Sequence, residues 1–77
     1  MAKLNAKLRA FGQAVRSERE RQAISQEELA DRAGLDRSYV GGVERGERNI
    51  GLLNIVKLSE ALHVSPGVFF NMERSHG

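Results

Sequence analysis

Apolar residues recur at helical spacing along most of the chain, which predicts short helices rather than strands. A first set has spacings of four, three and four positions, which is one face of a helix over about residues 5–22. Its members are Leu4, Leu8, Phe11 and Val15. Another helix over about 52–63 is marked by the apolar residues Leu52, Ile55, Val56 and Leu62, with Ser59 on the same stripe. No strand-like alternation of any length accompanies them, so the sequence predicts an all-α fold.

Capping residues indicate where the intervening helices begin and end. Ser25 precedes Glu28 by three positions, the pattern of a capping box in which the Ser25 hydroxyl accepts from the Glu28 amide and the Glu28 carboxylate accepts from the Ser25 amide. Gly34 supplies a left-handed residue that ends a helix over 26–33. The next helix then starts at Asp36 after a very tight turn.

The last helix begins after Ser65, because Pro66 fits a first helical position, where a missing amide costs nothing. The five predicted helices cover about residues 5–22, 26–33, 36–45, 52–63 and 66–72. With 77 residues the chain fits one domain, 1–77, since domains run to about 50–250 residues. A domain this small buries little surface by itself, which favours a second copy as partner.

The composition excludes several classes of function. The chain has no cysteine, so a disulfide framework, a thiolate nucleophile and a Cys-based metal site are excluded, and a reducing cytoplasm is expected. Its two histidines, His63 and His76, lie in no catalytic or metal-ligand pattern, so we expect neither an enzyme nor a cofactor. No apolar run approaches the ~20 residues of a membrane span, and we expect no membrane contact.

Two helices joined by a glycine-containing turn occur in many proteins, so this geometry alone does not establish DNA binding. The residues around the turn are more specific, because they resemble the helix–turn–helix of the lambda-repressor/Cro-like (Xre) family position by position. They are Gln26, Ala30, Gly34, Leu35, Val40, Val43 and Glu44. The resemblance covers about residues 11–70 and implies a five-helix DNA-binding domain whose motif spans about 25–45.

A longer run resembles the controller proteins of restriction–modification systems. It comprises residues 35–49, Leu53-Asn54-Ile55, Val64-Ser65-Pro66 and Phe69-Phe70. This resemblance implies a dimeric bacterial regulator that binds a pseudo-palindromic DNA operator, with two dimers on adjacent sites as one arrangement and RNA polymerase as a further partner. It would control its own gene and the endonuclease gene. Two alternatives stay open: a generic Xre repressor, such as a phage repressor or antitoxin, and a protein-interaction module that does not bind DNA.

Arg37 and Ser38 are the candidates for reading base edges, because the second helix of such a motif places its N-terminal residues in the major groove. Arginine pairs with guanine through two hydrogen bonds, and serine can donate or accept. Gln26 begins the preceding helix, where amides converge on a phosphate. A plain polar first-turn residue is the alternative for Gln26.

Tyr39 faces away from the predicted core, so its ring either contacts DNA or packs, half-buried, on the following loop. Gly42, next to Gly41, either lets the helix backbone approach the groove or only loosens the helix. Family resemblance places Arg45, Arg48 and Asn49 where relatives touch the DNA backbone or a groove edge.

The resemblance also implies a structural ion pair between Arg19 and Glu44 that holds the first helix against the reading helix. Leu53 and Phe70 are the candidates for a dimer interface within about 50–72, since both lie outside the expected core. The net charge of +2 is too small to indicate nucleic-acid binding by itself, but the excess lies wholly in residues 1–48. Many acids there are committed to helix starts or to Arg19, which is expected to leave three arginines comparatively free: Arg37, Arg45 and Arg48.

Overall fold

The computed structural model describes residues 2–70, and the side chains of residues 6–70. Four α-helices and a short 3₁₀ helix follow one another without a strand in this described part of the chain. The elements are α1 (Ala2–Arg21), α2 (Gln26–Ala33), α3 (Arg37–Glu44), α4 (Leu52–Ala61) and η1 (Pro66–Phe70). The predicted all-α class is therefore confirmed.

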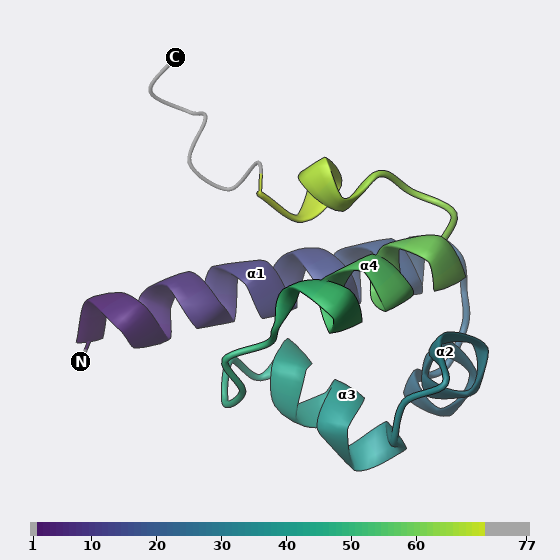
Figure 1. Cartoon of the computed structure of the whole chain (residues 1–77), viewed down its shortest axis with the longest axis horizontal. Helices are drawn as coiled ribbons and strands as arrows, with labels where there is room; N and C mark the ends of the chain where they lie inside the picture. The colour runs from purple at the N-terminus through teal and green to yellow at the C-terminus, as the bar shows by residue number, and fades with distance from the viewer. Residues whose placement is uncertain (1, 71–77) are drawn as a thin grey trace.

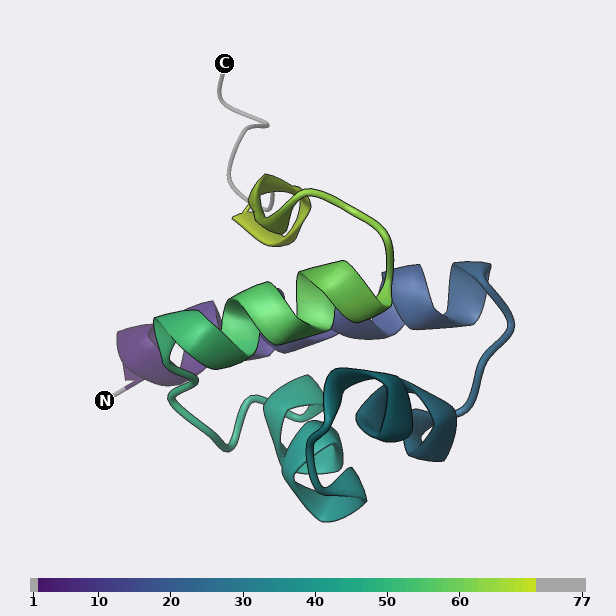
Figure 2. The same cartoon turned by 45° about the vertical axis from the view of Figure 1, so that its right-hand side comes forward.

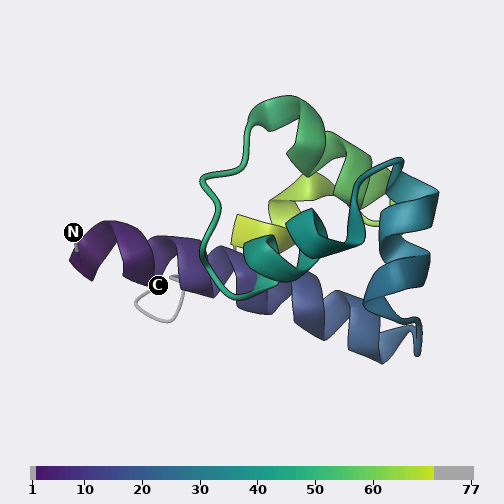
Figure 3. The ribbon, with the colours of Figure 1, turned by 90° about the horizontal axis from the view of Figure 1, so that it is seen from below.

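The long helix α1 contacts α3 and η1, while α4 contacts α2 and η1. In Figures 1 and 2, α2 and α3 lie on one side of both α1 and α4, and η1 lies on the other side, while Figure 3 shows α1 and α4 apart from one another. Seen from below in Figure 3, α3 lies in front of α1 and beside α2. This arrangement leaves the α2–α3 hairpin at one surface of the molecule, away from η1.

Most of the predicted boundaries hold to within three residues. Helix α2 has the predicted bounds, α1 begins earlier, at Ala2, and Asp36 is the N-cap of α3 rather than its first residue. Helix α4 ends at Ala61, and His63 beyond it has a left-handed φ of 58°. The prediction of a fifth α-helix over 66–72 is wrong in type, and residues 71 and 72 lie outside the described part.

The last element is a 3₁₀ helix because its few residues close short hydrogen-bonded turns from Ser65. The Val68 amide donates to the Ser65 carbonyl at 3.0 Å, and the Gly67 amide donates to the Ser65 hydroxyl at 3.3 Å. Pro66 has no amide to contribute. Apolar spacing over five residues does not distinguish this element from an α-helix.

The turn between α2 and α3 follows the predicted chemistry with one exception. The Ser25 hydroxyl accepts from the Glu28 amide at 3.0 Å, and Gly34 is left-handed with φ 70° and ψ 33°. The Glu28 carboxylate, expected to return to the Ser25 amide, accepts instead from Arg32 one helical turn away, at 3.0 Å. The cap is therefore one half of a capping box.

Buried apolar side chains from every element meet in one core. Phe69 of η1 is fully buried, and its ring meets that of Phe11 edge-on at 5.3 Å between centroids. The core residues are Phe11, Val15, Leu29, Ala30, Ala33, Val40, Val43, Leu58, Ala61, Leu62 and Phe69. No helix in the described part of the chain is long and apolar enough to cross a bilayer.

Two glycines bring α1 into close contact with the end of α3. A Cβ on Gly12 would stand 2.2 Å from the carbonyl oxygen of Val43 and 2.6 Å from that of Glu44. Gly46, just after α3, has a φ of 78°, and a Cβ there would stand 2.7 Å from the Cα of Arg9. Both contacts are with backbone atoms, which cannot move aside as a flexible side chain can. The orientation of α3 on α1 therefore depends on these two missing side chains.

Candidate nucleic-acid interface

The N-terminal end of α3 is exposed and held in place by its cap. Asp36 accepts from the backbone amide of Ser38 at 3.0 Å and from the Ser38 hydroxyl. The Ser38 hydroxyl, and then the Ser38 amide, hold the pKa of Asp36 below its ordinary value. Because the Ser38 hydroxyl donates to Asp36, its lone pairs remain available to accept a hydrogen bond from a ligand.

Arg37 is the first residue of α3, and it is exposed. In the part of the chain that the structure describes, no hydrogen bond or ion pair engages its guanidinium, although the charge of Arg37 contributes to the lowered pKa of Asp36. A free guanidinium at a helix start can form the two parallel hydrogen bonds that guanine accepts at O6 and N7.

The predicted partners Arg19 and Glu44 do meet, and a third residue joins them. Arg19 Nε lies 2.7 Å from Glu44 Oε2, and its Nη2 lies 3.0 Å from Glu44 Oε1. The Arg19 Nη1 also donates to the Ile24 carbonyl at 3.0 Å. The hydrogen bond to Glu44 first, and the charges of Glu44 and Glu20 after it, raise the pKa of Arg19 above its ordinary value. The pair joins α1 to α3 and to the segment before α2.

Gln26, predicted to contact phosphate, already has a partner in the protein. Its Nε2 donates to Glu44 Oε1 at 2.9 Å. The second amide proton of Gln26 and the backbone amides of the first two residues of α2 remain for a ligand, because the Glu28 amide already donates to Ser25. The side chain of Gln26 is thus oriented by the same carboxylate that binds Arg19, an arrangement that the sequence interpretation did not include.

Tyr39 is half-buried and lies at the centre of a small cluster. Its hydroxyl accepts a hydrogen bond from Asn54 Nδ2 of α4 at 3.1 Å, and the guanidinium carbon of Arg48 lies 5.7 Å from its ring centroid. Gly42 is buried next to this cluster, where an added Cβ would stand 3.1 Å from Arg48 Cγ. A DNA backbone can therefore approach Gly42 only if Arg48 moves.

Of the three arginines expected to be comparatively free, Arg45 is not. Its Nε and Nη2 each lie 3.1 Å from a carboxylate oxygen of Glu47, and both side chains are exposed. An exposed pair of this kind is weak and can exchange for a phosphate contact. Arg48 rests on Tyr39, so only Arg37 matches the expectation fully. Asn49 is exposed in the loop after α3.

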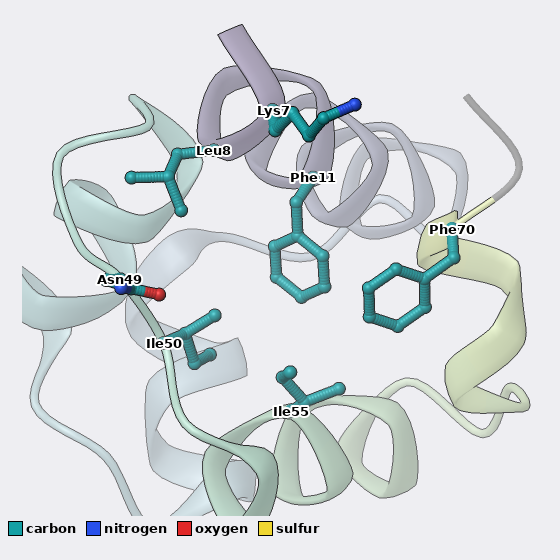
Figure 4. A pocket seen from close by; sticks show the side chains of 7 residues that line it. All are labelled: Lys7, Leu8, Phe11, Asn49, Ile50, Ile55 and Phe70. Atoms are coloured by element: carbon teal, nitrogen blue, oxygen red, sulfur yellow. The ribbon is translucent and has the colours of Figure 1, made fainter. Parts of the chain in front are cut away.

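A second exposed region carries apolar side chains. Leu53 and Phe70 are 75% and 54% exposed, and Leu52, which the sequence interpretation did not select, is 72% exposed. Figure 4 shows the side chains around an open hollow beside Phe70, and its lining is mostly apolar. The hollow has a volume of about 350 Å³. Its lining residues are Lys7, Leu8, Phe11, Asn49, Ile50, Ile55 and Phe70. The ring centroids of Phe11 and Phe70, which both line the hollow, lie 5.3 Å apart.

The chain is similar to a known protein family and to several known proteins. The helix-turn-helix family matches residues 15–69. Control protein C.BamHI from Bacillus amyloliquefaciens is 49% identical over 57 residues, which are 73% of this chain and 70% of that protein. The restriction–modification controller protein C.AhdI from Aeromonas hydrophila has a similar structure, with a TM-score of 0.83 and 55% identity over 84% of this chain and 98% of that one.

A second similar structure contains DNA. The controller protein C.Esp1396I, crystallised as a tetramer in complex with its natural 35 base-pair operator, is 33% identical. Its TM-score to this chain is 0.78, over 86% of this chain and 87% of that one.

Proposed function

We propose a DNA-reading role for α3 on the premise that this chain belongs to the helix-turn-helix family and, within it, to the controller proteins of restriction–modification systems. Membership makes the chain a sequence-specific, DNA-binding regulator of transcription rather than an enzyme. In this role α3 enters the major groove of an operator, in the bacterial cytoplasm, with its N-terminal end against the bases.

The single observation that carries the reading role is that the Arg37 guanidinium is exposed and available for a ligand. It stands at the exposed start of α3, and within the described residues it forms no hydrogen bond and no ion pair. We assign it the bidentate pair with guanine, which contributes about 1–3 kcal/mol of discrimination between base pairs. Ser38 beside it accepts from an amino group on a base edge, because its proton is committed to Asp36.

Phosphate contacts orient the hairpin on the duplex. We assign them to the start of α2, through the remaining donors of Gln26, and to the loop after α3, through Arg45, Arg48 and Asn49. Arg45 reaches a phosphate by exchanging Glu47 for it. These contacts carry no sequence information, but they supply affinity that falls as the salt concentration rises.

The exposed apolar region supports assembly as a dimer. Leu52, Leu53 and Phe70 expose apolar surface that a second copy would cover. A two-fold dimer sets its two reading helices about 34 Å apart and so requires a pseudo-palindromic operator. C.Esp1396I forms a tetramer on its operator, and we propose two dimers on adjacent sites for this chain as well. RNA polymerase is the further partner that we propose.

Footprinting of the DNA upstream of the protein's own gene tests this function. We expect a protected pseudo-palindrome whose half-sites lie about one helical turn apart. In the same binding reaction Arg37→Ala should leave no protection at the concentration that saturates the wild-type footprint. Protection of random sequence and upstream DNA alike would contradict sequence-specific control of that gene.

A further inference from the structure

We propose that Asn54 is a positioning residue for DNA recognition: its amide fixes the Tyr39 hydroxyl so that this hydroxyl donates its proton to an acceptor oxygen or nitrogen of the DNA. Asn54 lies on α4, outside the α2–α3 hairpin, and no feature of the helix–turn–helix motif itself indicates it. The inference rests on the proposed DNA-reading role of α3.

The direction of the hydrogen bond carries the argument. Asn54 Nδ2 donates to the Tyr39 oxygen at 3.1 Å, in a partly buried setting between α3 and α4. A phenolic hydroxyl can accept and donate at once. Since Asn54 occupies its acceptor side, the proton of Tyr39 is left, and among the described residues no oxygen or nitrogen accepts it. Accepting a hydrogen bond also makes a hydroxyl a better donor.

The same bond holds the ring on which Arg48 rests. The Arg48 guanidinium lies over the Tyr39 ring at 5.7 Å, and its aliphatic stem covers Gly42, where a Cβ would stand 3.1 Å from Cγ. A half-buried tyrosine without a fixed hydroxyl can tilt, and Arg48 would tilt with it. Asn54 therefore sets the direction of two candidate DNA contacts without itself being part of the reading helix.

A double-mutant cycle tests whether Asn54 acts through the hydroxyl. The four proteins are wild type, Asn54→Ala, Tyr39→Phe and the double variant, titrated against a labelled duplex from upstream of the protein's own gene and against a random duplex. We expect each single variant to bind the upstream duplex roughly fivefold more weakly, the scale of one hydrogen bond. The double variant should bind no more weakly than either single one, because Tyr39→Phe has already removed the acceptor.

Asn54→Asp tests the direction of the bond. A carboxylate accepts the phenolic proton instead of donating to the oxygen, so this variant should bind at least as weakly as Asn54→Ala. Gln13→Ala, which removes an exposed amide on α1, is the matched control and should bind like wild type. A penalty equal on both duplexes identifies a phosphate as the acceptor, and a penalty confined to the upstream duplex identifies a base edge.

Four results would overturn the inference. They are wild-type affinity in Asn54→Ala, wild-type affinity in Asn54→Asp, a full additional loss in the double variant, and wild-type affinity in Tyr39→Phe. The last decides the matter even if Asn54→Ala does not fold, because it removes the same hydrogen bond from the other side. If wild-type protein binds neither duplex, the proposed function fails as well; if it binds and the variants equal it, only the role of Asn54 fails.

Discussion

Arg19 of α1 binds Glu44 of α3 through two hydrogen bonds, from Nε to Oε2 at 2.7 Å and from Nη2 to Oε1 at 3.0 Å, although 25 positions separate the two residues. The Glu44 side chain is 2% exposed and that of Arg19 12% exposed, so water screens the pair little. Gln26 of α2 donates to the same carboxylate. One buried carboxylate thus connects α2 and α3, which present the reading surface, to α1.

Arg19→Ala should lower the free energy of unfolding by about 3 kcal/mol or more, because it leaves the Glu44 carboxylate buried without its cation. Loss of DNA binding should accompany the loss of stability. Arg19→Lys keeps the charge but cannot form both hydrogen bonds, so an intermediate loss is expected. Thermal unfolding followed by circular dichroism measures the stability of both variants, and a fluorescence titration measures their DNA binding. An Arg19→Ala protein with wild-type Tm and no DNA binding would show that Arg19 contacts DNA.

Gly12→Ala should destabilise the fold strongly, since the new Cβ would stand 2.2 Å from the Val43 carbonyl oxygen. Backbone must move to admit it, and we expect a loss of about 3 kcal/mol or more, or about 10 °C or more in Tm. Gly51→Ala is the matched control, because nothing lies within 4 Å of a Cβ at that position. Equal Tm values for the two variants would mean that α1 and α3 are not in close contact.

Gly42→Ala should separate stability from DNA binding. Alanine favours a helix by up to about 1 kcal/mol over glycine, so the Tm should hold or rise. The new Cβ would stand 3.1 Å from Arg48 Cγ and 3.2 Å from its Nε, and Arg48 should leave the Tyr39 ring. We expect affinity for the upstream duplex to fall several-fold in a fluorescence titration, while Gly67→Ala in η1 binds like wild type. Unchanged affinity in Gly42→Ala would refute a role for the position of Arg48.

Asp36 should make stability sensitive to acid. Its pKa is lowered in the folded chain by the Ser38 hydroxyl and then by the Ser38 amide. A carboxyl whose folded pKa lies below its unfolded value contributes stability that is present above the unfolded value and is lost as the pH falls through the folded one. The difference in Tm between wild type and Asp36→Asn should therefore be constant above about pH 5 and shrink below pH 4.

The control for this pH series is Asp31→Asn, which removes an exposed aspartate on α2. Comparison with this variant separates the effect of the Asp36 contacts from that of removing one negative charge. A gap between wild type and Asp36→Asn that stayed the same down to the lowest pH would show that the charge of Asp36 does not stabilise α3.

Local signals in the sequence were sufficient for most of the fold. Ser25 and Gly34 mark the limits of α2 because a cap and a left-handed residue each require a particular residue type. The type of the last element was wrong because five residues around Pro66 have the same apolar spacing in a 3₁₀ helix and in an α-helix. The Arg19–Glu44 pair came from family resemblance, since no local pattern relates residues 25 positions apart.

Local patterns in the sequence do not predict which side chains meet between helices. Gly12 has the appearance of a weak point in a helix, and only the carbonyl oxygens of α3 explain its presence. The Asn54–Tyr39 hydrogen bond likewise joins two helices whose packing is not encoded by either segment alone. The prediction that Arg45 is free rested on a count of charges. Such a count does not show which side chains lie together, so it missed the ion pair between Arg45 and Glu47.

The central claim is that Arg37 reads base sequence, and one titration tests it most directly. Wild type and Arg37→Ala are titrated at low and moderate salt against the upstream duplex and against a random duplex of equal length. We predict that Arg37→Ala loses about tenfold or more in affinity for the upstream duplex per half-site while its affinity for the random duplex changes little beyond one lost charge. If Arg37→Ala keeps the wild-type ratio of the two affinities, Arg37 does not read the sequence and the account is wrong.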